Sequence, residues 1–158
     1  MRSEEAVNRA IENYASTVKR ICFIHLKNEA DTEDICQTVF LKYAMNDKVF
    51  DSEAHEKAWI IRVTINACKD LLKSFFRKHT VSLDAYVEQG GVVDAAHSEV
   101  LEAVLALPEK YRRVIYLHYY EGYPAADIAE ILRINVNTVY TQLTRAKTLL
   151  RDELGGEA

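Results

Sequence analysis

Apolar residues recur at intervals of three and four along most of this chain, which is the spacing of one face of an α-helix. The first such stripe lies in residues 4–27 and comprises Ala6, Ala10, Tyr14, Val18, Ile21 and either Ile24 or His25. A second helix is predicted over residues 32–46, with Asp31 or Thr32 as its cap and with Glu33 and Asp34 in its first turn. A third is predicted over residues 57–78.

Two further stripes lie close together in residues 127–150, DIAEILRINVNTVYTQLTRAKTLL. Ile128, Ala129 and Leu132 share one face of a short helix, and Ile134 fills the turn that follows it. The stripe of the next helix comprises Val139, Leu143, Ala146 and Leu150. Two short helices joined by so tight a turn predict a helix-turn-helix.

The turn and the outer face of the second helix support this interpretation. Asn135 is placed as the N-cap of that helix, whereas Arg133 occupies a position where such turns often carry glycine. The residues predicted to face outward are Asn137, Tyr140, Thr141, Thr144, Arg145, Thr148 and Arg151. From Arg133 to Arg151 there are four basic residues and no acidic one, although the whole chain has a net charge of -4. Such a face suits a DNA major groove, and the alternative is an amphipathic hairpin with a solvated surface.

The helix predicted over residues 57–78 is also basic on one side, with six basic residues and one acidic residue. Its apolar positions are Trp59, Ile60, Val63, Ala67, Leu71 and Phe75. The polar positions that return every three or four residues are Arg62, Asn66, Lys69, Lys73 and Arg77. We therefore expect a second cationic surface on this helix.

Composition indicates an all-α fold with two small helical domains. The 158 residues include only two prolines and five glycines, and 49% of them are hydrophobic. Residues 79–98 contain Gly90 and Gly91 and three acidic residues but no lysine or arginine. This segment is predicted to be a flexible linker between a domain at 1–78 and a domain at 99–154 that holds the helix-turn-helix.

Several functional classes are disfavoured by what the sequence contains. There is no run of roughly 18 to 20 apolar residues that would span a membrane, and residues 1–10 lack the apolar stretch of a signal peptide, so we expect a cytoplasmic protein. Cys22, Cys36 and Cys68 are odd in number and widely spaced, which argues against a disulfide framework and favours core thiols. Cys22 and His25 lie one helical turn apart without a second ligand pair, so no metal or other cofactor is assigned. The absence of a glycine-rich phosphate loop and of a nucleophile beside a base argues against an enzyme.

Three segments carry a family resemblance. TEDICQTVFLK at 32–42 resembles an E-D-x-x-Q-x-x-F-x-K motif, and AWIIRVTINACKDLLK at 58–73 resembles W-L-x-R-I-x-x-N-x-x-x-D-x-x-R. Residues 107–150 resemble a whole C-terminal module. In this order and spacing, they resemble the bacterial RNA polymerase sigma factors of the small, two-domain extracytoplasmic-function (ECF) type.

This resemblance implies roles for the first domain. Its second helix would bind the clamp of the RNA polymerase core through Asp34, Gln37, Phe40 and Lys42, although Phe40 equally fits a core position. The same domain would recognise and melt the minus-10 element of promoter DNA. The residues implied in that step are Phe50, in a loop at 49–55 that accepts a flipped base, and Arg62, Asn66, Lys69 and Lys73. Trp59 matches a family tryptophan and fits either core packing or stacking on DNA.

The resemblance implies that the second domain reads the minus-35 element. The matching residues are Asn137, Thr138, Tyr140, Thr141, Gln142, Thr144 and Arg145. Arg112 and Arg113 would reach backbone phosphates, and helices within 101–121 would pack on the polymerase flap. An anti-sigma factor is a further expected partner, and membrane insertion is not expected. Two other hypotheses remain open, which are a helix-turn-helix regulator that never joins the polymerase and a helical protein-interaction adapter.

Overall fold

The computed structural model describes residues 1–26, 28–79 and 99–155, and within these ranges the regular structure is helical. The chain divides into two compact units, Met1–Val93 and Asp94–Ala158. The all-α, two-domain fold predicted from the sequence is confirmed. Among the described helices, none is long and apolar enough to cross a membrane.

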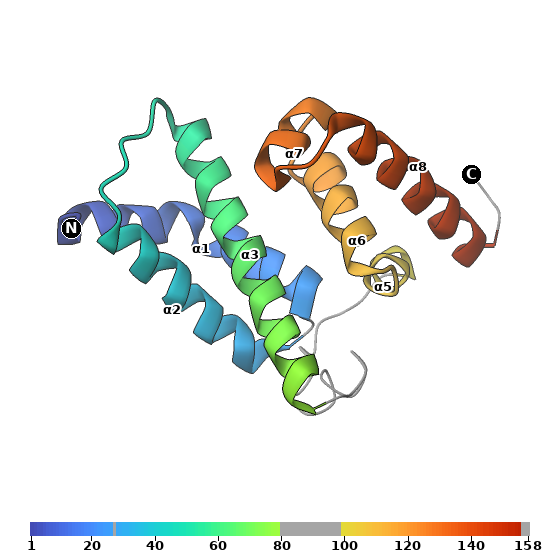
Figure 1. The fold of residues 1–158 in the computed structure, drawn as a ribbon, viewed down its shortest axis with the longest axis horizontal. Coiled ribbons are helices and arrows are strands. Elements are labelled where there is room, and N and C mark those ends of the chain that lie inside the picture. The colour runs from blue at the N-terminus through green and yellow to red at the C-terminus, as the bar shows by residue number, and fades with distance from the viewer. Residues whose placement is uncertain (27, 80–98, 156–158) are drawn as a thin grey trace. The chain divides into compact units, whose positions relative to one another are not determined.

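The first unit is built from three long helices, α1 (Glu4–Leu26), α2 (Glu29–Met45) and α3 (Glu53–His79). Each of them packs against the other two (Figure 1). Their apolar faces enclose one core, whose fully buried members include Val18, Cys22, Leu26, Val39, Ile60 and Cys68. The predicted inner stripe of α1 is confirmed from Ala10 to His25.

Two helices of this unit begin earlier than predicted. α2 starts at Glu29 because the buried Asn28 caps it, with its Oδ1 accepting a hydrogen bond from the Asp31 amide at 3.0 Å. The prediction of Asp31 or Thr32 as the cap is therefore wrong, and Glu29 and Asp31 are the acids of the first turn. α3 starts ahead of the predicted residue 57, because Ser52 Oγ accepts from the amide of His55 at 3.1 Å.

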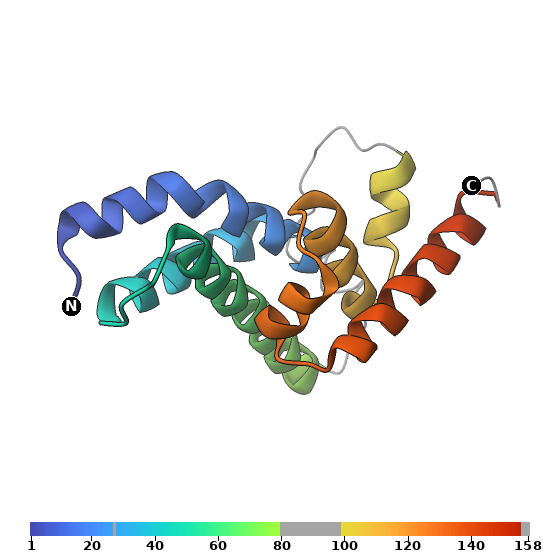
Figure 2. The same ribbon diagram turned by 90° about the horizontal axis from the view of Figure 1, so that it is seen from above.

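The second unit contains α5 (Glu99–Leu105), α6 (Glu109–Ile115), α7 (Ala125–Leu132) and α8 (Val136–Glu153). α6 continues directly into a turn of π-helix, η1 (Tyr116–Tyr120). Both α6 and α7 pack on α8 (Figure 2). Pro108 precedes α6, and Gly122 follows η1 with a positive φ of 80°.

α7 and α8 form the predicted helix-turn-helix. Arg133 ends α7 in the left-handed conformation, with φ 57° and ψ 48°, and Asn135 caps α8 by accepting a hydrogen bond from the Asn137 amide at 2.7 Å. Val139, Leu143 and Ala146 are buried as predicted, whereas Leu150 is only half-buried. The buried residues of α7 are Ala125, Ile128 and Ile131, and the predicted Ala129 and Leu132 are half-buried. The contacting face of α7 is thus turned slightly from the predicted one.

Part of the predicted organisation falls outside the described residues. α3 continues through His79, which the sequence analysis placed at the start of the linker. The rest of that linker, residues 80–98, lies outside the described ranges, as do the side chains of Phe75 and Arg77.

Candidate nucleic-acid and polymerase interfaces

The outer face of α8 presents the polar and basic side chains expected from the sequence. All of the residues predicted to face outward are exposed, namely Asn137, Tyr140, Thr141, Thr144, Arg145, Thr148 and Arg151. Tyr140 is 57% exposed although it is a large aromatic residue. An exposed aromatic ring among amides, hydroxyls and cations can contact bases as well as sugars.

A shallow hollow of about 320 Å³ lies between the start of α6 and the first turns of α8. It is lined by Lys110, Tyr111, Asn137, Thr138, Thr141, Gln142 and Arg145. Lys110 is exposed, and its Nζ lies 5.1 Å from the centroid of the Tyr111 ring. Two cations and no carboxylate line this hollow, which gives it the character of a site for phosphate or base edges.

Lys110 was missed by the sequence analysis, which selected Arg112 and Arg113 instead. Both arginines are buried, Arg112 completely, so their prediction as phosphate contacts is wrong. Arg112 Nη1 donates a hydrogen bond to the carbonyl oxygen of Leu105 at 3.3 Å, and burial lowers the pKa of this guanidinium. The helical period held a signal for Arg112. Lys110 and Arg112 are two residues apart, and side chains two residues apart in a helix point to roughly opposite sides.

The basic side of α3 is partly open to solvent. Asn66, Lys69 and Lys73 are exposed and recur at intervals of three and four, so they lie along one side of the helix. Arg62, one turn earlier, is half-buried. This row can follow a nucleic-acid strand, with cations that contact phosphates and an amide that can hydrogen-bond a base.

Phe50 lies in the loop of residues 46–52 and is half-buried. Its ring is parallel to that of Tyr43, at a centroid distance of 6.4 Å, and lies 5.8 Å from Trp59. His55 meets the ring edge to face at 5.3 Å. Trp59 itself is only 8% exposed, so core packing and not stacking on DNA describes its position.

Tyr43 is also fixed at its hydroxyl. Glu56 accepts hydrogen bonds from the hydroxyls of Tyr43 at 2.7 Å and Tyr14 at 2.8 Å, so one carboxylate joins all three helices of the unit. Burial and this carboxylate raise the pKa of both phenols.

Three of the four side chains predicted to contact the polymerase from α2 are exposed. Asp34, Gln37 and Lys42 are open to solvent. Phe40 is 8% exposed and belongs to the core cluster, so its prediction as a surface contact is wrong and core packing is correct. Two residues missed from the sequence lie on the open side of α2, because Leu41 and Met45 are 63% and 62% exposed despite being apolar. The signal available in the sequence was that Leu41 and Met45 lie outside the stripe of buried residues on α2.

The cysteines are free thiols in the first unit. Cys22 and Cys68 are fully buried, with their sulfur atoms 3.9 Å apart. His25 lies with Nδ1 3.0 Å from the backbone oxygen of Ile21, an ordinary backbone hydrogen bond for a buried histidine. Among the described residues, no group of three or more histidine, cysteine, aspartate or glutamate side chains gathers as it would around a metal ion.

Comparison with known proteins identifies both units. Residues 10–78 match the family model "Sigma-70 region 2", and residues 97–150 match "Sigma-70, region 4". The chain is 28% identical over 170 residues to the ECF RNA polymerase sigma factor SigW of Bacillus subtilis (strain 168), covering 96% of this chain and 90% of that protein. It is 29% identical over 150 residues to the RNA polymerase sigma factor SigV of the same strain, covering 93% and 90%.

Solved structures show the same fold. The sigma factor RpoE from Bartonella quintana, crystallised with the anti-sigma factor NepR, superimposes with a TM-score of 0.75 at 16% identity, covering 96% of this chain and 98% of that one. CnrH, solved with the cytosolic domain of CnrY, has a TM-score of 0.68 at 21% identity. Sigma factors are non-enzymatic transcription factors. Both family regions match, and the relatives align over nearly the whole chain. This chain therefore belongs to the ECF sigma factors, which direct RNA polymerase to promoters for transcription initiation.

Proposed function

We propose that the two units divide promoter recognition between them. Residues 1–78 bind the polymerase core and recognise and open the minus-10 element, and residues 99–154 read the minus-35 element through α8. The observation that supports this division is the hollow between α6 and α8, because no carboxylate lines it and it opens to solvent beside a row of exposed amide, hydroxyl and cationic side chains.

For the minus-35 element, the proposed reading set is Asn137, Thr138, Tyr140, Thr141, Gln142, Thr144 and Arg145. Amide side chains pair well with adenine, and arginine pairs well with guanine, in the major groove. Lys110 joins the set as a phosphate contact from α6, in place of the buried Arg112 and Arg113. Tyr140 and Gln142 occupy positions that are often basic in this family, so we expect the base preference to differ accordingly.

For the minus-10 element, the proposed surface combines α3 with the loop before it. Lys69 and Lys73 hold strand phosphates, Asn66 hydrogen-bonds a base edge and Arg62 extends the row. Phe50 contacts the flipped base on one side.

For the polymerase, the proposed clamp contact is the exposed side of α2, with Asp34, Gln37 and Lys42 supported by the apolar Leu41 and Met45. Helices within residues 101–121 contact the flap. An anti-sigma factor is a further proposed partner, because the compared RpoE structure is a complex with one. The chain would act in the cytoplasm, where the polymerase and its promoters are.

Affinity for DNA should come mainly from assembly with the polymerase. Three or four phosphate contacts give a salt-dependence slope of only about 3 in log affinity. The net charge of -4 repels nucleic acid outside the two basic surfaces. Once the core holds both units on one promoter, the second contact becomes effectively intramolecular.

The test is transcription by purified bacterial core polymerase with this chain, on a promoter pool randomised at both elements. We expect transcripts enriched for defined sequences at each element, with Arg145→Ala weakening the minus-35 preference and Lys73→Ala weakening the minus-10 preference. A regulator that never joins the polymerase would bind duplex DNA without supporting transcription. An adapter would do neither, and either result would overturn the proposal.

A further inference from the structure

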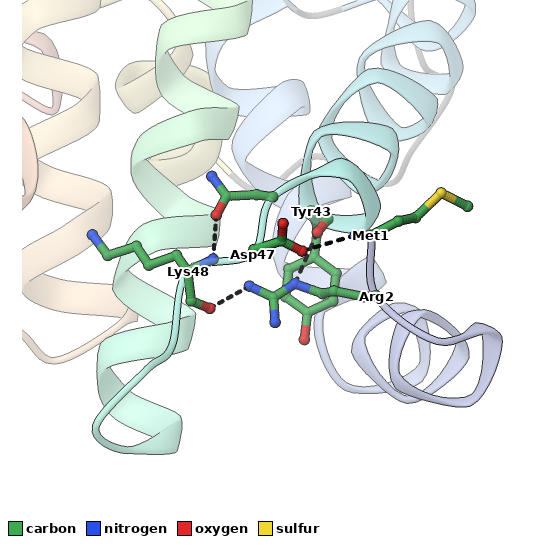
Figure 3. Close-up of polar contacts among 6 residues, drawn as sticks. Met1, Arg2, Tyr43, Asp47 and Lys48 are labelled. Atoms are coloured by element: carbon green, nitrogen blue, oxygen red, sulfur yellow. Dashed lines mark hydrogen bonds and ion pairs between the residues drawn. The ribbon is translucent and has the colours of Figure 1, made fainter.

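Arg2 links the end of α2 to the loop of residues 46–52 through one backbone carbonyl of each (Figure 3). Its Nε donates a hydrogen bond to the oxygen of Tyr43 at 2.9 Å, at the end of α2. Its Nη2 donates to the oxygen of Lys48 at 2.6 Å, in the middle of the loop. A single planar guanidinium therefore fixes the distance between the helix end and the loop backbone.

The same guanidinium also covers the aromatic side chains beside the loop. Its central carbon lies 4.3 Å from the ring centroid of Tyr43 and 5.3 Å from that of Phe50. Both distances are within the range of cation–π contact. Arg2 thus restrains the ring of Phe50 as well as the backbone next to it.

Other contacts keep Arg2 in place against the loop. Its backbone amide donates to the oxygen of Ala44 at 2.8 Å, and the amino group of Met1 lies 2.8 Å from Asp47 Oδ1. Within the loop, Asn46 Oδ1 accepts from the amide of Lys48 at 2.6 Å. The start of the chain and this loop are consequently joined by contacts that span more than forty residues of sequence.

We propose that Arg2 is a positioning residue for minus-10 recognition, which sets the backbone at Lys48 and the ring of Phe50 before DNA arrives. This inference rests on the proposed role of the first unit. A loop without such restraint loses conformational freedom when it captures a base, and that loss weakens capture. Arg2 lies at the edge of the core, over the rings of Tyr43 and Phe50, while the rest of that core is enclosed by the three helices. Its removal should therefore affect base preference more than folding.

The test uses the promoter pool described above with holoenzyme carrying Arg2→Ala, Arg2→Lys or the control Arg9→Ala, and a purification tag at the C-terminus. Arg9 is an exposed cation on α1, so the control removes the same charge from the same unit. For Arg2→Ala we expect the minus-10 enrichment to fall roughly fivefold or more, the size of effect that loss of charged hydrogen bonds produces. The minus-35 enrichment, core binding and melting temperature should stay close to those of Arg9→Ala.

The conservative variant separates positioning from a direct phosphate contact. A lysine keeps the charge but lacks the planar fork that reaches two carbonyls, so Arg2→Lys should recover only a small part of the minus-10 preference. Full recovery by Arg2→Lys would overturn the inference, as would an unchanged minus-10 preference in Arg2→Ala or an equal loss at both elements. If wild-type holoenzyme shows no minus-10 preference, the proposed function fails and this inference fails with it.

Discussion

Arg112 donates a hydrogen bond from Nη1 to the carbonyl oxygen of Leu105, the last residue of α5. The final carbonyls of a helix have no partner within it, so a buried side-chain donor at this point satisfies one of them. Arg112 therefore connects α6 to the end of α5, although a basic residue close to a helix-turn-helix is easily interpreted as a DNA contact. Lys110, two residues earlier, lines the open hollow instead.

Arg112→Ala should destabilise the second unit by about 2 to 3 kcal/mol, because it removes buried volume and leaves a buried carbonyl without its donor. Hydrogen exchange of the α8 amides in the full chain would measure this. Lys110→Ala is the matched control and should leave exchange unchanged. Normal exchange in Arg112→Ala, together with weakened DNA binding, would contradict the assignment.

Lys110→Ala should lower the salt-dependence slope for minus-35 duplex binding by holoenzyme by about 0.9, the value for one lost phosphate contact. The measurement is a titration of labelled duplex at several salt concentrations. Lys147→Ala serves as the control, since Lys147 lies on α8 but has its Nζ 5.5 Å from the Tyr119 ring centroid and is not among the residues lining the hollow. An equal slope for Lys110→Ala and wild type would remove Lys110 from the interface.

Arg133→Gly should stabilise the helix-turn-helix by about 0.5 kcal/mol. Glycine removes the strain that a side chain has in the left-handed conformation, and this gain exceeds the entropy that glycine adds to the unfolded chain. Arg133→Val should cost about 1 to 2 kcal/mol, because a β-branched residue tolerates positive φ poorly. Thermal unfolding of both variants checks the pair. A glycine variant clearly less stable than wild type would show that the arginine side chain has a stabilising contact that outweighs its strain.

The first unit should lose stability in alkaline solution above about pH 10. Burial and the Glu56 carboxylate raise the pKa of Tyr14 above its ordinary value of 10.0. A phenol whose folded pKa is raised stabilises the fold fully below the unfolded pKa, and this contribution is lost as the pH rises further, because only the unfolded state then releases its proton. Tyr14→Phe should make the alkaline decline shallower, as followed by Trp59 fluorescence in urea titrations. An unchanged decline would mean that other groups cause it.

The existence of the helices was predictable, because their apolar stripes are long and regular. α8 is an example, where Val139, Leu143 and Ala146 follow one period and all are buried. The start of α2 was harder to predict, since Asn28, Asp31 and Thr32 are all suitable caps by residue type. The extended backbone of Asn28, with φ -143° and ψ 117°, decides between them, and residue type does not reveal it.

The candidate site residues also include some that helical spacing predicts and some that it does not. The exposed face of α8 follows from its period, whereas Phe40 and Arg112, whose roles were implied by the family resemblance, are buried. Helical spacing alone would have argued against both. The restraint of Phe50 by Arg2 was beyond prediction from local pattern, because the contact joins residues 48 positions apart that no periodicity relates.

The π-helical turn at Tyr116–Tyr120 affects how this part of the chain can change in length. A π-turn accommodates one residue more than an α-helical turn between the same two ends. Deleting one residue here would let the backbone close into ordinary α-helix while α6 and Gly122 keep their places. Evolution can therefore shorten this segment by one position and turn Tyr119 or Tyr120 to a new direction without rebuilding α8.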